Sequence, residues 1–131
     1  MKQFIKHSRF ALIYSIIVIL LCALPGDSMP SLDFMDLFSF DKIAHMLAFG
    51  ILCILTAIAL AKYLHFSYMR KYVLHWTFFY CIFLGAATET GQAYLAVHRS
   101  GDWLDFIADA LGVLAGLVLF LILYTRKPVR L

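Results

Sequence analysis

The sequence predicts an all-α membrane protein, a bundle of four transmembrane helices in a single domain over residues 1–131. Of its 131 residues, 63% are hydrophobic and only 15% are charged, against about 25% charged residues in a typical soluble domain. A surface with so few charges has to be covered largely by lipid. The sequence contains four apolar runs, each a candidate membrane span. The last three approach or exceed the roughly 20 residues that a helix needs to cross a bilayer.

The first predicted helix covers residues 10–24 and is the shortest of the four, so it needs its flanks to span a bilayer. It follows the basic residues Lys2, Lys6 and Arg9 and ends before Pro25, which cannot continue a helix. The same arrangement is typical of a cleaved secretory signal peptide. Because no small-x-small cleavage site follows the apolar run, we expect a retained helix.

Three further helices are predicted, over residues 43–64, 73–94 and 103–124. Residues 25–40 are polar and aromatic, which predicts a short outer segment, re-entrant or interfacial, between the first two helices. A basic, tyrosine-rich turn joins the second helix to the third, and a short polar loop joins the third to the fourth.

The distribution of basic residues predicts the orientation. Of eleven Lys and Arg residues, only Lys42 and Arg99 fall on the side of the membrane opposite the termini. The positive-inside rule therefore places both termini in the cytoplasm. Topology accounts for the basic residues, so we expect no nucleic-acid partner. The residues on the side of the termini are Lys2, Lys6, Arg9, Lys62, Arg70, Lys71, Arg126, Lys127 and Arg130.

All eight carboxylates lie in or near the outer half of the predicted bundle. Ionisable residues within a membrane are costly and are functional candidates by default. The structural alternative is a polar plug that holds the helices in register, but buried ion pairs stabilise poorly compared with apolar packing. A site at the outer face is therefore favoured. The carboxylates are Asp27, Asp33, Asp36, Asp41, Glu89, Asp102, Asp105 and Asp109.

Two predicted helices each carry a polar pair on one face. Asp41 and His45 are four residues apart at the start of the second helix. Glu89 and Gln92 are three apart near the end of the third, and both spacings place side chains on the same face. Asp41 or Ser39 could instead cap the second helix. An ionised Glu89 would be unfavourable against lipid, so we expect it to face the interior.

One face of the fourth predicted helix carries carboxylates in its outer half and glycines in its inner half. These residues form a stripe because they are spaced three, four, three and four positions apart, as on one side of a helix. The Gly112-x-x-x-Gly116 spacing allows close helix approach, either within one chain or between two copies. This face should therefore contact protein, and its acids should turn toward the same interior. The residues of the stripe are Asp102, Asp105, Asp109, Gly112 and Gly116.

Together and in this order, these motifs resemble the VanZ-like family, which is named for a teicoplanin-resistance protein. The resemblance covers roughly residues 41–116 and implies a four-helix protein of the bacterial cytoplasmic (inner) membrane, with its polar site facing outward. At the position of Asp109 the family pattern has Asn, so this chain carries an additional carboxylate. The matching positions are Asp41-Lys42-x-x-His45, Glu89-x-x-Gln92, Arg99, Asp102, Asp105, Gly112 and Gly116.

The outer-face residues predict a pocket that binds or processes an amphiphilic envelope substrate, either a lipid-linked precursor, a phospholipid or a lipoglycopeptide. Lys42 and Arg99 would hold an anionic group, the arginine in bidentate fashion. The predicted substrate-binding residues are Lys42, Arg99, Gln92, Asp41 and Asp102.

Four residues are predicted to carry any chemistry at this pocket: Glu89, His45, Asp105 and Asp109. Glu89 and His45 are the acid/base candidates. Asp105 and Asp109 would orient His45, or the four would bind a divalent cation, the one cofactor that these residue types suggest. No serine or cysteine stands out as a nucleophile.

Two other function classes remain open from the sequence. One is a non-catalytic envelope or antibiotic-resistance factor that binds its ligand without changing it. The other is a proton-coupled transporter, since intramembrane acids and histidine suit proton relays. Because the polar stripe stops at Gly112, a pocket closed toward the cytoplasm is favoured over a transport path.

Overall fold

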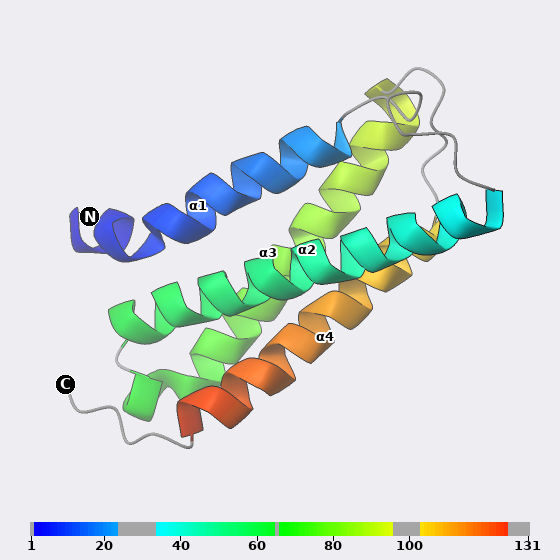
Figure 1. Cartoon of the computed structure of the whole chain (residues 1–131). Coiled ribbons are helices and arrows are strands. Elements are labelled where there is room, and N and C mark those ends of the chain that lie inside the picture. The colour runs from blue at the N-terminus through cyan, green and yellow to red at the C-terminus, as the bar shows by residue number, and fades with distance from the viewer. Residues whose placement is uncertain (1, 24–33, 65, 96–102, 126–131) are drawn as a thin grey trace.

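The computed structural model describes residues 2–23, 34–64, 66–95 and 103–125, and every regular element in these ranges is an α-helix. The described part contains α1 (Lys2–Cys22), α2 (Phe34–Tyr63), α3 (Phe66–Leu95) and α4 (Trp103–Thr125). Figure 1 shows the start of α1 and the end of α4 toward the same end of the bundle. The predicted all-α class is confirmed for these ranges.

Three of the helices are long and apolar enough to cross a membrane, through Ile5–Cys22 of α1, Phe40–Tyr63 of α2 and Trp103–Tyr124 of α4. All four helices expose large hydrophobic side chains such as Phe83 and Leu123, which lipid would cover. The chain is therefore a membrane protein. α3 is less apolar, because polar residues interrupt its apolar sequence, and it does not meet the same criterion.

α1, α2 and α3 begin seven to nine residues earlier than the apolar runs predict, at Lys2, Phe34 and Phe66. The added segments contain no proline or glycine, so nothing in them breaks a helix. The apolar boundary marks a change in polarity and not the end of the helix. The prediction that Ser39 or Asp41 caps α2 was wrong, since both lie inside it.

The predicted outer segment between the first two helices is only partly described. Residues 24–33 lie outside the described ranges, and residues 34–40 form the first two turns of α2. The later part of that segment is therefore continuous helix, not a separate re-entrant or interfacial element.

The closest packing in the bundle is between α2 and α4, at glycines. A Cβ atom at Gly112 would collide with the carbonyl oxygen of Met46, and one at Gly116 would lie 2.7 Å from the carbonyl oxygen of Gly50 and 2.9 Å from Cβ of Cys53. Because residue numbers rise together along both helices, α2 and α4 run parallel. The glycine spacing thus serves packing within one chain.

α1 and α3 run the other way. The hydroxyl groups of Ser15 and Tyr80 are 2.8 Å apart, and Gln92 Nε2 donates to the carbonyl oxygen of Cys22 at 2.7 Å, so residue numbers also rise together along α1 and α3. Because Ala61 of α2 packs with Val73 of α3 in an apolar cluster, the two pairs are antiparallel. One end of the bundle, the polar end, therefore gathers the ends of α1 and α3 and the beginnings of α2 and α4.

An apolar core fills the rest of the bundle. Its middle is built by all four helices from buried residues: Val18, Phe49, Leu52, Cys53, Cys81, Leu84 and Val113. A second cluster, of Ala57, Ala61, Val73 and Phe120, lies toward the opposite end. This packing holds the helix ends in fixed register and so positions the polar side chains described below.

Candidate functional site

The innermost polar group at the polar end is a trio of side chains from three helices. His45 Nδ1 of α2 lies 2.9 Å from Asp109 Oδ1 of α4, and 3.9 Å from Glu89 Oε1 of α3. The side chains of His45 and Asp109 are 6% and 1% exposed. A carboxylate can only accept a hydrogen bond, so an ionised Asp109 requires that Nδ1 of His45 carry the proton.

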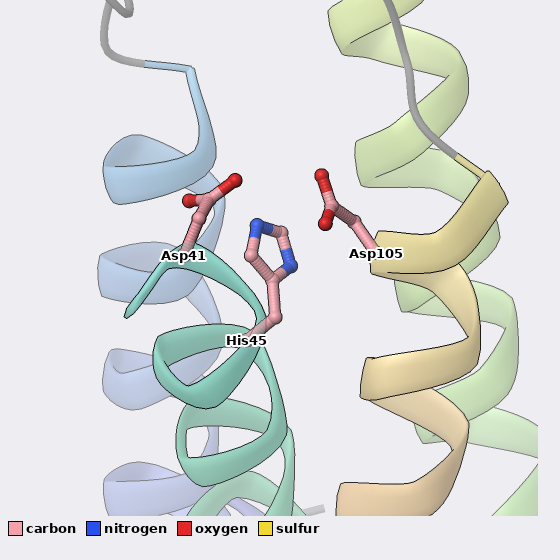
Figure 2. Close-up of side chains that lie close together, drawn as sticks. All are labelled: Asp41, His45 and Asp105. Atoms are coloured by element: carbon pink, nitrogen blue, oxygen red, sulfur yellow. The ribbon is translucent and has the colours of Figure 1, made fainter. Parts of the chain in front are cut away.

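A second polar group lies one turn nearer the bundle end. Lys42 Nζ of α2 donates to Asp105 Oδ1 of α4 at 3.0 Å. Figure 2 shows the His45 ring between Asp41 of its own helix and Asp105 of α4. Ligand atoms of these three residues lie within 4.8 Å of one another. His45 is thus the residue that both polar groups share.

Among the described residues, carboxylates outnumber cationic side chains at the site. Four carboxylates, those of Asp41, Glu89, Asp105 and Asp109, surround one lysine and one histidine. Even with His45 protonated, the described cations balance only half of the ionised acids. Like charges this close repel unless protons or cations intervene, so the arrangement suits proton exchange or cation binding.

Beside this cluster lies an apolar groove of about 430 Å³ between the ends of α1 and α3. Thr88 and Gln92 contribute its polar atoms, and Glu89 lies between them in the sequence. Gln92 also donates to α1, which ties the end of that helix to the site. The groove is lined by Ile19, Cys22, Ala23, Leu84, Ala87, Thr88, Gly91 and Gln92.

The structure brings together most of the residues singled out from the sequence. Six are charged or titratable and lie in the cluster, and Gln92 borders it. Arg99 and Asp102 lie outside the described residues. The sequence did not indicate the contribution of α1, because Ile19 and Cys22 are ordinary residues of an apolar run. The six are Asp41, Lys42, His45, Glu89, Asp105 and Asp109.

Gly85 is a further residue that shapes the site. It lies one turn before Glu89 on α3, and a Cβ atom there would come within 3.2 Å of Asp109 Oδ2 and 3.4 Å of Phe49 Cε1. The missing side chain lets α3 approach the buried carboxylate. Glycine at this spacing was visible in the sequence, but its contact with α4 was not.

A model of the VanZ/LLP1 family matches residues 2–124 of the chain. The chain belongs to this family. The match confirms the resemblance found in the motifs and extends it from the first residue of α1 almost to the end of α4. No curated protein and no solved structure matches the chain. In this member of the VanZ/LLP1 family, the described ionisable residues of the motifs lie in the cluster around His45.

Proposed function

We propose that this VanZ/LLP1-family protein binds an amphiphilic envelope lipid at the polar end of the bundle. The observation that carries the proposal is that one stretch of α3 contributes to both the charged cluster and the apolar groove. Thr88 and Gln92 line the apolar groove, and Glu89, between them in the sequence, belongs to the charged cluster. A charged head group suits the cluster and an apolar chain suits the groove. Ligand sites commonly pair apolar walls with a few convergent polar groups.

We propose an anionic head group that binds through Lys42 at the edge of the cluster, which requires that protons or a bound cation offset the buried carboxylates. Its side chain is 22% exposed and already donates to Asp105, so its ammonium group can reach a ligand as well as the buried acid. Arg99 is proposed as the second anion-binding residue. A lipid-linked precursor, a phospholipid and a lipoglycopeptide all offer such a group on an apolar anchor.

We also propose that α3 crosses the membrane with the other three helices. The parallel packing of α2 and α4 supports this, since the chain has to return to the polar end between them. α3 has 30 residues and so is about 45 Å long at 1.5 Å per residue, enough for a bilayer core of roughly 30 Å. With the cytoplasmic termini that the positive-inside rule predicts, we propose that the polar end lies at the outer face of a bacterial inner membrane.

A closed pocket is better supported than a proton path through the bundle. Within the described ranges, the core of the opposite end consists of Ala57, Ala61, Val73 and Phe120. The buried polar residues near it, Thr56 and Thr77, carry hydroxyl groups and no charge. Such a core offers no titratable relay for protons.

Blocking the groove should remove lipid binding without unfolding the protein. Nothing lies within 4 Å of a Cβ atom at Gly91, so Gly91→Trp would place a large side chain in the groove. We expect at least a ten-fold loss of binding to a polyprenyl phosphate or phosphatidylglycerol, measured by native mass spectrometry from nanodiscs. Ala86→Trp, on an exposed part of α3 away from the groove lining, is the matched control. Equal binding by both variants would contradict the proposal.

Turnover separates a lipid-processing enzyme from a binding factor. Glu89 and His45 are the proposed proton-transfer groups because they lie 3.9 Å apart in the cluster. If the protein processes its lipid, Glu89→Gln should reduce turnover by at least about 100-fold, as removal of an acid/base group does, with little change in melting temperature. Thin-layer analysis of the lipid measures turnover. A native protein that binds the lipid and leaves it unchanged is a binding factor.

A further inference from the structure

The atoms around His45 Nδ1 have the identity and spacing of a metal site. We propose that His45, Glu89 and Asp109 bind one first-row divalent cation, with Zn²⁺ and Mn²⁺ as the best matches. This inference goes beyond lipid binding, because the protein's own side chains supply the ligands. It rests on the distances within this trio, on the buried and unpaired oxygen of Asp109 and on the types of donor atom.

The distances fit a single ion. Ligand atoms about 2.1 Å from one metal are about 3.4 Å apart in the tetrahedral geometry of Zn²⁺. In octahedral geometry they are about 3 Å apart at right angles and about 4 Å apart on opposite sides. His45 Nδ1 lies 2.9 Å from Asp109 Oδ1 and 3.9 Å from Glu89 Oε1. All three ligand atoms lie within 4.8 Å of one another. An ion between them therefore requires only small side-chain movements.

Asp109 supplies an independent indication. Its side chain is 1% exposed, and its second oxygen, Oδ2, has no hydrogen-bond partner among the described residues. That oxygen is directed toward α3, since a Cβ atom at Gly85 would lie 3.2 Å from it. An unpaired buried carboxylate oxygen is costly, and a cation held between α3 and α4 would satisfy it.

Donor type selects the class of ion. The trio offers one imidazole nitrogen and two carboxylate oxygens. Imidazole nitrogen suits Zn²⁺ and its first-row neighbours, whereas Mg²⁺ and Ca²⁺ prefer oxygen ligands alone. Metal binding at Nδ1 leaves the ring neutral with its one proton on Nε2. A protonated ring therefore releases its Nδ1 proton to solvent on binding, whereas a ring that is already neutral releases none.

The neighbouring group of Asp41, His45 and Asp105 is the weaker candidate. Its ligand atoms are as closely spaced, but the ammonium group of Lys42 lies 3.0 Å from Asp105 Oδ1. That positive charge already compensates the carboxylate and would repel a second cation. The inner trio has no lysine within it, so the ion belongs there.

Metal titration of the purified full chain tests the assignment. The protein in detergent, freed of its affinity tag and stripped with EDTA, is titrated with Mn²⁺ by electron paramagnetic resonance and with Zn²⁺ by calorimetry. We expect one ion per chain and a much weaker response to Mg²⁺ and Ca²⁺. Asp109→Asn and Glu89→Gln should each weaken binding by at least about 100-fold, the upper range for loss of even an outer-shell partner.

Two further variants make the result specific. His75→Gln removes an exposed histidine elsewhere on α3 and should bind the ion as the native protein does, whereas Asp41→Asn tests the outer group and should weaken binding less than Asp109→Asn does. Absence of saturable binding in the native protein would overturn the proposal. Binding that survives Asp109→Asn and is lost in Asp41→Asn would also overturn it, by moving the ion to the outer group. No lipid is added, so failure here is distinct from failure of lipid binding, which is measured separately in EDTA.

Discussion

Replacing Gly112 by alanine is expected to cause one of the largest losses of stability of any single-methyl change in this protein. The added Cβ atom would collide with the backbone carbonyl oxygen of Met46, which cannot rotate away as a side chain would. Overpacking typically costs about 1–3 kcal/mol and occasionally more. Because α2 and α4 would have to separate along their whole contact, we expect a loss of at least about 2 kcal/mol.

The measurement is thermal unfolding in detergent, followed by far-ultraviolet circular dichroism, together with the yield from membranes. Gly91→Ala is the matched control, because nothing lies within 4 Å of its new methyl group. It should keep or slightly raise stability, since alanine favours a helix over glycine by about 1 kcal/mol. Equal melting temperatures for the two variants would show that the α2–α4 contact is looser than described.

The second large effect is expected at the buried pair of His45 and Asp109. Either His45→Leu or Asp109→Val alone leaves a polar partner buried, and breaking a buried pair in this way costs about 3–5 kcal/mol. Replacing both partners by apolar residues of comparable size is often neutral or stabilising. We therefore expect each single variant to melt well below the native protein and the double variant to recover most of the loss.

A double-mutant cycle on unfolding free energies measures this coupling, which we expect to exceed the roughly 0.5–3 kcal/mol usual for residues in contact, because the double variant should cost less than either single variant. The same double variant also separates a polar plug from a functional site. A stable double variant that no longer binds metal or lipid assigns the pair to function. A stable double variant that still binds both metal and lipid would show that neither side chain of the pair is needed for binding, against our expectation.

The helices were largely predictable and their ends were not. The apolar runs over 43–64 and 103–124 predicted the membrane-spanning parts of α2 and α4, because hydrophobic length is a local property. The start of α2 at Phe34 was not predicted, since polarity changes at the membrane boundary while helix propensity does not. For the same reason the proposed cap at Asp41 was wrong.

For the candidate site too, the sequence predicted features within one helix but not contacts between helices. Helical spacing alone put Asp105 and Asp109 on the glycine face of α4 and predicted that they face protein. It could not predict that Lys42 pairs with Asp105 while His45 pairs with Asp109, because these partners are 63 and 64 residues apart. Such pairings depend on how one helix is shifted along another.

By itself the sequence determined that this is a helical membrane protein of the VanZ/LLP1 type with its acids near one end, because composition and spacing within a helix are local. The tertiary structure alone decided that the glycines pack against α2 and that α1 closes one side of a groove. It also placed His45 Nδ1 between Glu89 and Asp109. These features depend on helix register and on backbone contact at Gly112 and Gly116, which arise only when the helices pack together.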